Sequence, residues 1–70
     1  MKGFFRTQEE NLAARLLQWK YQRAGIPLPD PAAIRKQAER IVDEAHRIAR
    51  ERGRNVAGII KELIGEIGKK

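Results

Sequence analysis

The apolar residues of this chain recur at helical spacing rather than in the strict alternation typical of strands. In the middle of the chain they follow one another at steps of four and three, at Ile34, Ala38, Ile41, Ala45 and Ile48. Towards the C-terminus they share one arc of a helix, at Val56, Ile59, Ile60, Leu63, Ile64 and Ile67. A period near 3.6 residues places such positions on one face. Both stretches are therefore predicted to be amphipathic helices that turn this face towards a core.

The first apolar stretch differs, because its apolar residues spread over two adjoining sides of a helix. One side carries Leu12, Leu16 and Trp19, and the other carries Ala13, Leu17, Tyr21 and Ala24. A helix that is apolar over so wide an arc needs two neighbours. We expect this helix to pack against both of the others, with Trp19 in the core. The alternative is that one of its sides faces a partner chain.

Capping residues mark the starts of the three helices. Thr7 and Glu10 fit a capping box, in which each side chain satisfies a free backbone N–H. Asp30 stands directly before Pro31, which is the order expected of an N-cap and a first helical residue. Asn55 precedes the last apolar stretch and is predicted to cap a third helix.

Gly25 and Gly53 mark the ends of the first two helices, because glycine readily adopts the left-handed conformation that terminates a helix. The prediction is an all-α fold, a compact three-helix bundle with helices at about 8–24, 31–52 and 56–67.

This bundle is expected to form a single domain over residues 7–68. Residues 1–6 are predicted to be a flexible N-terminal segment, in which Phe4 and Phe5 cover the open end of the bundle. Residues 69–70 are predicted to be a frayed basic C-terminus.

Composition then narrows the classes of function. The chain has 70 residues, no cysteine, no serine, one threonine and one histidine. No disulfide framework or thiolate metal site can form, and the usual nucleophiles are missing. We therefore expect no catalysis, no cofactor, no bound metal and no small-molecule substrate. No stretch is apolar enough to span a bilayer, so we expect a cytoplasmic protein and do not favour membrane binding.

Glu39, Asp43 and His46 align along one side of the second predicted helix, at spacings of four and three. Such a line could cradle a cation. Arginines lie close to the same side, and the ligand sets of di-metal helical bundles draw on more helices and more carboxylates. We interpret these three residues as part of a surface ion-pair ladder.

Charge points to a second kind of partner. Fifteen Lys and Arg outweigh nine Asp and Glu, which gives a net charge of +6. The candidate phosphate or nucleic-acid contacts are Lys36, Arg40, Arg47, Arg50, Arg52 and Arg54. The alternative is that the arginines only stabilise the C-terminus of the second helix.

Acid–base pairs at a spacing of four would neutralise part of this basic run. The predicted pairs are Asp43 with Arg47, Arg40 with Glu44, and Arg47 with Glu51. Outward positions of the third helix hold only Lys61, Glu62 and Glu66, so we expect no sequence-specific reading of bases.

The function expected from the sequence is that of a small protein–protein interaction module, which could associate with itself. Its candidate contacts are Ala13, Leu17 and Tyr21, or else the stripe formed by Gly58 and Gly65. Each of these glycines costs about 1 kcal/mol of helix stability relative to alanine. Either the third helix is loosely held near the chain end, or the bare stripe lets another backbone approach closely. Non-specific nucleic-acid binding through the basic residues is the alternative.

Overall fold

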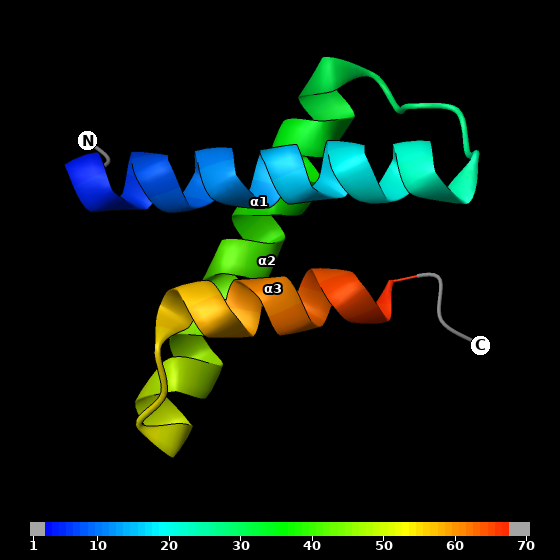
Figure 1. The fold of residues 1–70 in the computed structure, drawn as a ribbon. Helices are drawn as coiled ribbons and strands as arrows, with labels where there is room; N and C mark the ends of the chain where they lie inside the picture. The colour runs from blue at the N-terminus through cyan, green and yellow to red at the C-terminus, as the bar shows by residue number, and fades with distance from the viewer. Residues whose placement is uncertain (1–2, 68–70) are drawn as a thin grey trace.

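A computed structural model describes residues 3–67, which form helices α1 (Phe4–Ala24), α2 (Pro31–Arg52) and α3 (Val56–Glu66). Helices α1 and α3 lie side by side and run in the same direction, and α2 crosses both (Figure 1). Every helix contacts the other two, and the Cα positions extend over 34 × 31 × 13 Å. The all-α three-helix bundle predicted from the sequence is confirmed. It is flat, with α1 and α3 in one layer and α2 in the other.

Helix α1 begins at Phe4, four residues before the predicted start at residue 8. Gly3 is its N-cap, and the backbone N–H of Thr7 donates to the Gly3 carbonyl over 3.1 Å. The Thr7 hydroxyl also donates to this carbonyl, so Thr7 lies inside the first turn and the predicted capping box with Glu10 is wrong. Residues 4–6, predicted to be flexible, are helical, and Arg6 among them bonds to Glu10 and to Asp43 of α2, as described below. The predicted frayed end at 69–70 lies outside the described residues.

The predicted glycine ends of α1 and α2 are confirmed. Gly25 has φ 70° and Gly53 has φ 63°, both in the left-handed region. After α1, the N–H groups of Gly25 and Ile26 donate to the carbonyls of Gln22 and Tyr21 over 3.2 and 3.0 Å. This paired arrangement satisfies carbonyls that the end of a helix would otherwise leave free.

The predicted starts of α2 and α3 are also confirmed, although only one uses its side chain. Asn55 Oδ1 accepts a 2.8 Å hydrogen bond from the N–H of Ala57, which caps α3. Asp30 makes no such side-chain bond; instead its backbone carbonyl accepts the N–H of Ile34 over 3.0 Å. Pro31 occupies the first position of α2, where its missing N–H costs nothing.

The core lies where the three helices meet, and aliphatic side chains form it. Its buried residues are Ala13, Leu17, Ile34, Ala38, Val42, Ala45, Ile59, Ile60 and Ile64. The predicted core faces of α2 and α3 are thus largely correct, with Ile41 and Ile48 packed at the margin. The prediction for Trp19 is wrong, because its side chain is 54% exposed. Phe4 and Phe5 do not cover the bundle either, and are 70% and 78% exposed.

Candidate functional site

The six basic residues predicted to contact phosphate are all exposed, on α2 or just beyond its end. Four of them recur at steps of four, seven and three, at Lys36, Arg40, Arg47 and Arg50. These steps place them on the side of α2 that faces away from its core residues. Arg52 ends the helix and Arg54 lies in the loop before α3.

Two of these six residues are engaged by acids of the same chain. Arg47 bonds to Glu44 and, over 2.7 Å, to Glu51. The hydrogen bond from Arg47 lowers the pKa of Glu44, and the same bond raises the pKa of Arg47. Arg54 bonds to Glu62 of α3 over 2.5 Å. Of the predicted pairs, Arg47 with Glu51 is therefore confirmed, whereas Glu44 pairs with Arg47 rather than with Arg40.

The other four basic residues are Lys36, Arg40, Arg50 and Arg52. Within residues 3–67 none of these four pairs with an acid. All of them but Arg52, which is the last residue of the helix, form a cationic stripe along the outer side of α2. The concentrated run expected between Arg47 and Arg54 is therefore only partly available.

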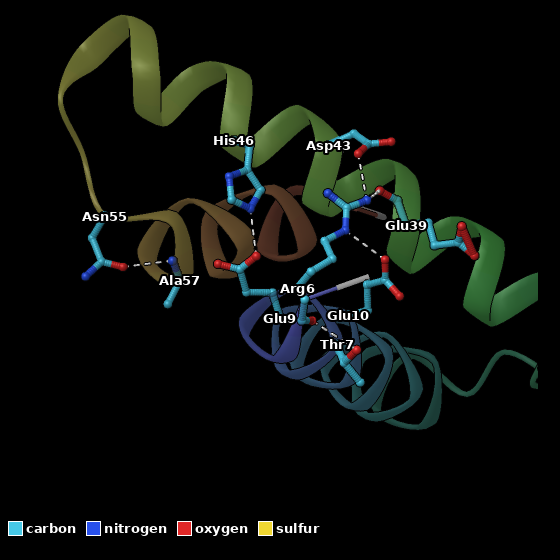
Figure 2. A network of polar contacts seen from close by, with 10 residues as sticks. Arg6, Thr7, Glu9, Glu10, Glu39, Asp43, His46, Asn55 and Ala57 are labelled. Atoms are coloured by element: carbon cyan, nitrogen blue, oxygen red, sulfur yellow. Dashed lines mark hydrogen bonds and ion pairs between the residues drawn. The ribbon is translucent and has the colours of Figure 1, made fainter. Parts of the chain in front are cut away.

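Arg6 ties the first turn of α1 to the middle of α2 (Figure 2). Its Nε donates to Glu10 Oε2 over 2.8 Å, and its Nη2 donates to Asp43 Oδ1 over 2.7 Å and to the backbone carbonyl of Glu39 over 3.5 Å. Hydrogen bonds to Glu10 and Asp43 raise the pKa of Arg6. The sequence predicted that Glu39 and Asp43 belong to an ion-pair ladder, with Arg47 as the partner of Asp43. The structure instead pairs Asp43 with Arg6 of α1.

His46 joins the same two helices on the next turn of α2. Its Nε2 lies 2.6 Å from Glu9 Oε1 (Figure 2). We call the five residues that make these side-chain contacts the α1–α2 latch, and they are Arg6, Glu9, Glu10, Asp43 and His46. The described residues contain no cluster of His, Asp and Glu arranged to hold a metal ion. The geometry of the latch is that of a structural contact between helices.

Glu10 is the latch residue that sequence reasoning misplaced. It was expected to cap a helix at the surface, but it is only 4% exposed and is the one buried charged residue among those described. The signal that could have found it is the spacing of four between Arg6 and Glu10, which places opposite charges together on a helix.

The residues predicted to form a partner interface differ in how exposed they are in the structure. Ala13 and Leu17 are completely buried against the other two helices, so their assignment to an external contact is wrong. Tyr21 is half-buried, and its hydroxyl donates to Gln37 Oε1 over 3.1 Å. Gly58 and Gly65 are not closely approached, because a Cβ at either would meet nothing within 4 Å.

A recess of about 350 Å³ opens at the C-terminal end of α1, between this helix, the link that follows it and the end of α3. We call it the Trp19 recess, and it is lined by Trp19, Lys20, Tyr21, Arg23, Ala24, Ile26 and Ile67. The Arg23 guanidinium lies 5.0 Å from the centre of the Trp19 ring, within the range of a cation–π contact. Lys20 Nζ donates to the carbonyl of Gly65 over 3.0 Å, which ties this end of α1 to α3.

Comparison of the chain with family models, with curated proteins and with solved structures gave no match. Along residues 3–67, no helix combines the length and the apolar character needed to cross a membrane.

Proposed function

We propose that this chain is a small, non-catalytic protein–protein interaction module that binds its partner at the Trp19 recess. The observation that carries the proposal is the 54% exposure of Trp19 in a chain whose core holds only Ala, Val, Leu and Ile. A small domain gains most stability by burying its largest apolar side chain, and this one leaves it outside. Tryptophan at the centre of a pocket is a frequent anchor of protein interfaces.

The neighbours of Trp19 support the same proposal. Ile26 and Leu28, in the link after α1, are 49% and 50% exposed. Three large apolar side chains therefore lie close together along the chain at this end of the molecule. The recess is at the small end of the range of ligand pockets, roughly 300–1,000 Å³, which suits an anchoring side chain or two of a partner.

A non-catalytic and cytoplasmic role belongs to this proposal. The chain has no serine and no cysteine, and its one histidine is engaged with Glu9. Proteins that lack cysteine need no oxidising compartment to fold.

Selection of binders from a displayed library of random peptides tests the docking surface. We expect the enriched peptides to bind the full chain and to lose binding to the Trp19→Ala variant. Phe4→Ala is the matched control, because it removes an exposed aromatic side chain from the other end of α1 that does not line the recess. Circular dichroism checks that both variants fold. Enriched peptides that bind Trp19→Ala as tightly as the parent would refute the proposal.

Non-specific nucleic-acid binding is a second candidate, favoured by the stripe of unpaired cations on α2. Arg50 and Arg52 have no acidic partner in the described chain, so both are available to phosphate. A mixed-sequence duplex should then bind at about 50 mM salt, weaken steeply towards about 200 mM, and weaken when both arginines become alanine. No binding at the lower salt concentration would eliminate this candidate.

A further inference from the structure

The Trp19 recess has both apolar and cationic residues in its lining, and we call the apolar ones its floor and the cationic ones its rim. Trp19, Ala24, Ile26 and Ile67 contribute the apolar surface, and Lys20 and Arg23 contribute the positive charge. None of the residues that line the recess is acidic. An apolar side chain of a partner would pack against the floor, and a carboxylate next to it would pair with the cations of the rim.

The Arg23 side chain is held in place and has no acidic partner in the described residues, so it can bind such a carboxylate. Its guanidinium is held over the Trp19 ring, 5.0 Å from the ring centre, and makes no ion pair with any acid of residues 3–67. A guanidinium fixed against an aromatic ring loses less conformational entropy when it binds, and its planar fork matches the two oxygens of a carboxylate. Lys20 Nζ donates a hydrogen bond to the Gly65 carbonyl, which holds the ammonium group at the rim.

A second copy of the chain is a poor occupant of this recess. A symmetric contact through the recess would place Lys20 and Arg23 close to their own copies, and each molecule carries a net charge of +6. A copy also has few carboxylates to offer, because most of its acids already have partners in their own chain, among them Glu9, Glu10, Glu39, Asp43, Glu44, Glu51 and Glu62.

A nucleic acid suits the recess less well than a peptide does. Bases bind to aromatic side chains by stacking on an open ring face, and Arg23 lies over the ring of Trp19. The apolar lining residues, such as Trp19 and Ile67, are instead suited to pack against an aliphatic or aromatic side chain of a peptide.

We infer that the partner segment is an acidic peptide of another protein, with an aliphatic or aromatic anchor in the Trp19 recess and one or more carboxylates against Arg23 and Lys20. This inference rests on the proposed function and adds the chemistry of the partner to it.

The composition of the peptides enriched on the full chain tests this inference. They should carry an excess of Asp and Glu beside an apolar anchor. One of them, synthesised and titrated by calorimetry, should bind Arg23→Gln about 3-fold to 10-fold more weakly and should weaken as salt is added. Arg15→Gln is the matched control, since Arg15 is an exposed arginine of α1 that does not line the recess. This variant should bind as the parent does.

The outcomes separate the inference from the proposed function. Peptides that depend on Trp19 but show no excess of acids, or that bind Arg23→Gln and the parent equally, overturn the inference and leave the docking surface in place. Peptides that bind Trp19→Ala unchanged overturn both. Sedimentation of the chain alone completes the test: a dimer that Trp19→Ala dissociates would identify the occupant as a second copy and overturn the inference.

Discussion

Four glycines of this chain differ in what their backbone positions require. Gly25 and Gly53 terminate helices with positive φ angles, which other residues adopt only at a cost of about 1–2 kcal/mol. Gly58 and Gly65 lie inside α3, where an ordinary helical backbone suits any residue and where a Cβ would meet nothing within 4 Å. The first pair is needed for the fold, and the second pair is not.

Alanine substitutions measure this difference. Gly58→Ala and Gly65→Ala should each raise the free energy of unfolding by about 0.5–1 kcal/mol, because alanine restricts the unfolded chain and favours the helix. Gly25→Ala, the matched control, should lower it by about 1–2 kcal/mol. Denaturant unfolding followed by circular dichroism gives the three values. Destabilisation by Gly58→Ala would show that space around α3 is already occupied.

The carboxyl group of Glu44 provides a residue-level test by pH. Its hydrogen bond from Arg47 holds its pKa below the ordinary value of 4.5 in the folded chain. Because the folded pKa is the lower one, this contact stabilises the fold above the unfolded pKa, and the contribution is lost as pH falls through the folded pKa. In an NMR titration, Arg47→Gln should raise the pKa of Glu44 towards its ordinary value.

Arg50→Gln is the control for that titration, because Arg50 makes no ion pair within the described chain. It should leave the pKa of Glu44 unchanged. An equal shift in both variants would mean that Glu44 responds to the general charge of α2 rather than to Arg47.

At the scale of the helices, one of two capping predictions from the sequence is correct and the other is wrong. Asn55 caps α3 through its side chain, whereas Thr7 lies within α1 and only bonds back to Gly3. Asn55→Ala should therefore cost about 1 kcal/mol of stability, and Thr7→Ala less than about 0.5 kcal/mol. Thermal unfolding of the two variants compares them directly. A larger loss for Thr7→Ala would favour the helix start at residue 8.

The α1–α2 latch gives a second test at this scale. Arg6→Met keeps most of the packing of the side chain but removes a charge-assisted hydrogen bond to the buried Glu10, so it should cost about 1–3 kcal/mol. Asp43→Asn changes an exposed partner of the same arginine and should cost less than about 1 kcal/mol. Urea unfolding measures both. Equal losses would assign the strength of the latch to Asp43 rather than to Glu10.

Most helix boundaries could be predicted because their signals are local. A glycine at a helix end, or a proline at its first position, acts through the few residues around it, and Gly25, Pro31 and Gly53 all behave as expected. The start of α1 could not be predicted in this way. Its N-cap is Gly3, which has no side chain to signal a helix start, and Arg6 in its first turn bonds to Asp43, a residue 37 positions away on another helix.

At the scale of the whole molecule, the candidate site was predicted less well than the fold. Trp19 and Leu17 lie on adjoining sides of the wide apolar arc of α1, and the sequence pattern does not rank them. The way in which α2 and α3 pack against α1 buries Leu17 completely and leaves Trp19 at the surface. The sequence therefore revealed that α1 has more apolar surface than one neighbour needs, but assigned the wrong residues to the outside.

The structure also shows where part of the positive charge behind the net charge of +6 lies. Acids of the same chain neutralise Arg6, Arg47 and Arg54, while Arg23 at the rim of the recess keeps its charge available. Among residues 3–67, cations without an acidic partner therefore include some on the outer side of α2 and those that line the Trp19 recess. The recess combines its positive charge with the exposed Trp19 and has no acid in its lining, whereas the hollow that holds Phe5 and Arg50 is also lined by Glu9 and Asp43. This difference is why we place the docking surface at the recess.

Fluorescence quenching of Trp19, the only tryptophan, tests this account most directly. An exposed indole beside Arg23 and Lys20 should be quenched strongly in the folded chain, and more by iodide than by caesium, because the rim attracts anions. Arg23→Gln should reduce the difference between the two ions. An indole that neither ion reaches until the chain unfolds, or that caesium quenches as well as iodide, would contradict the account.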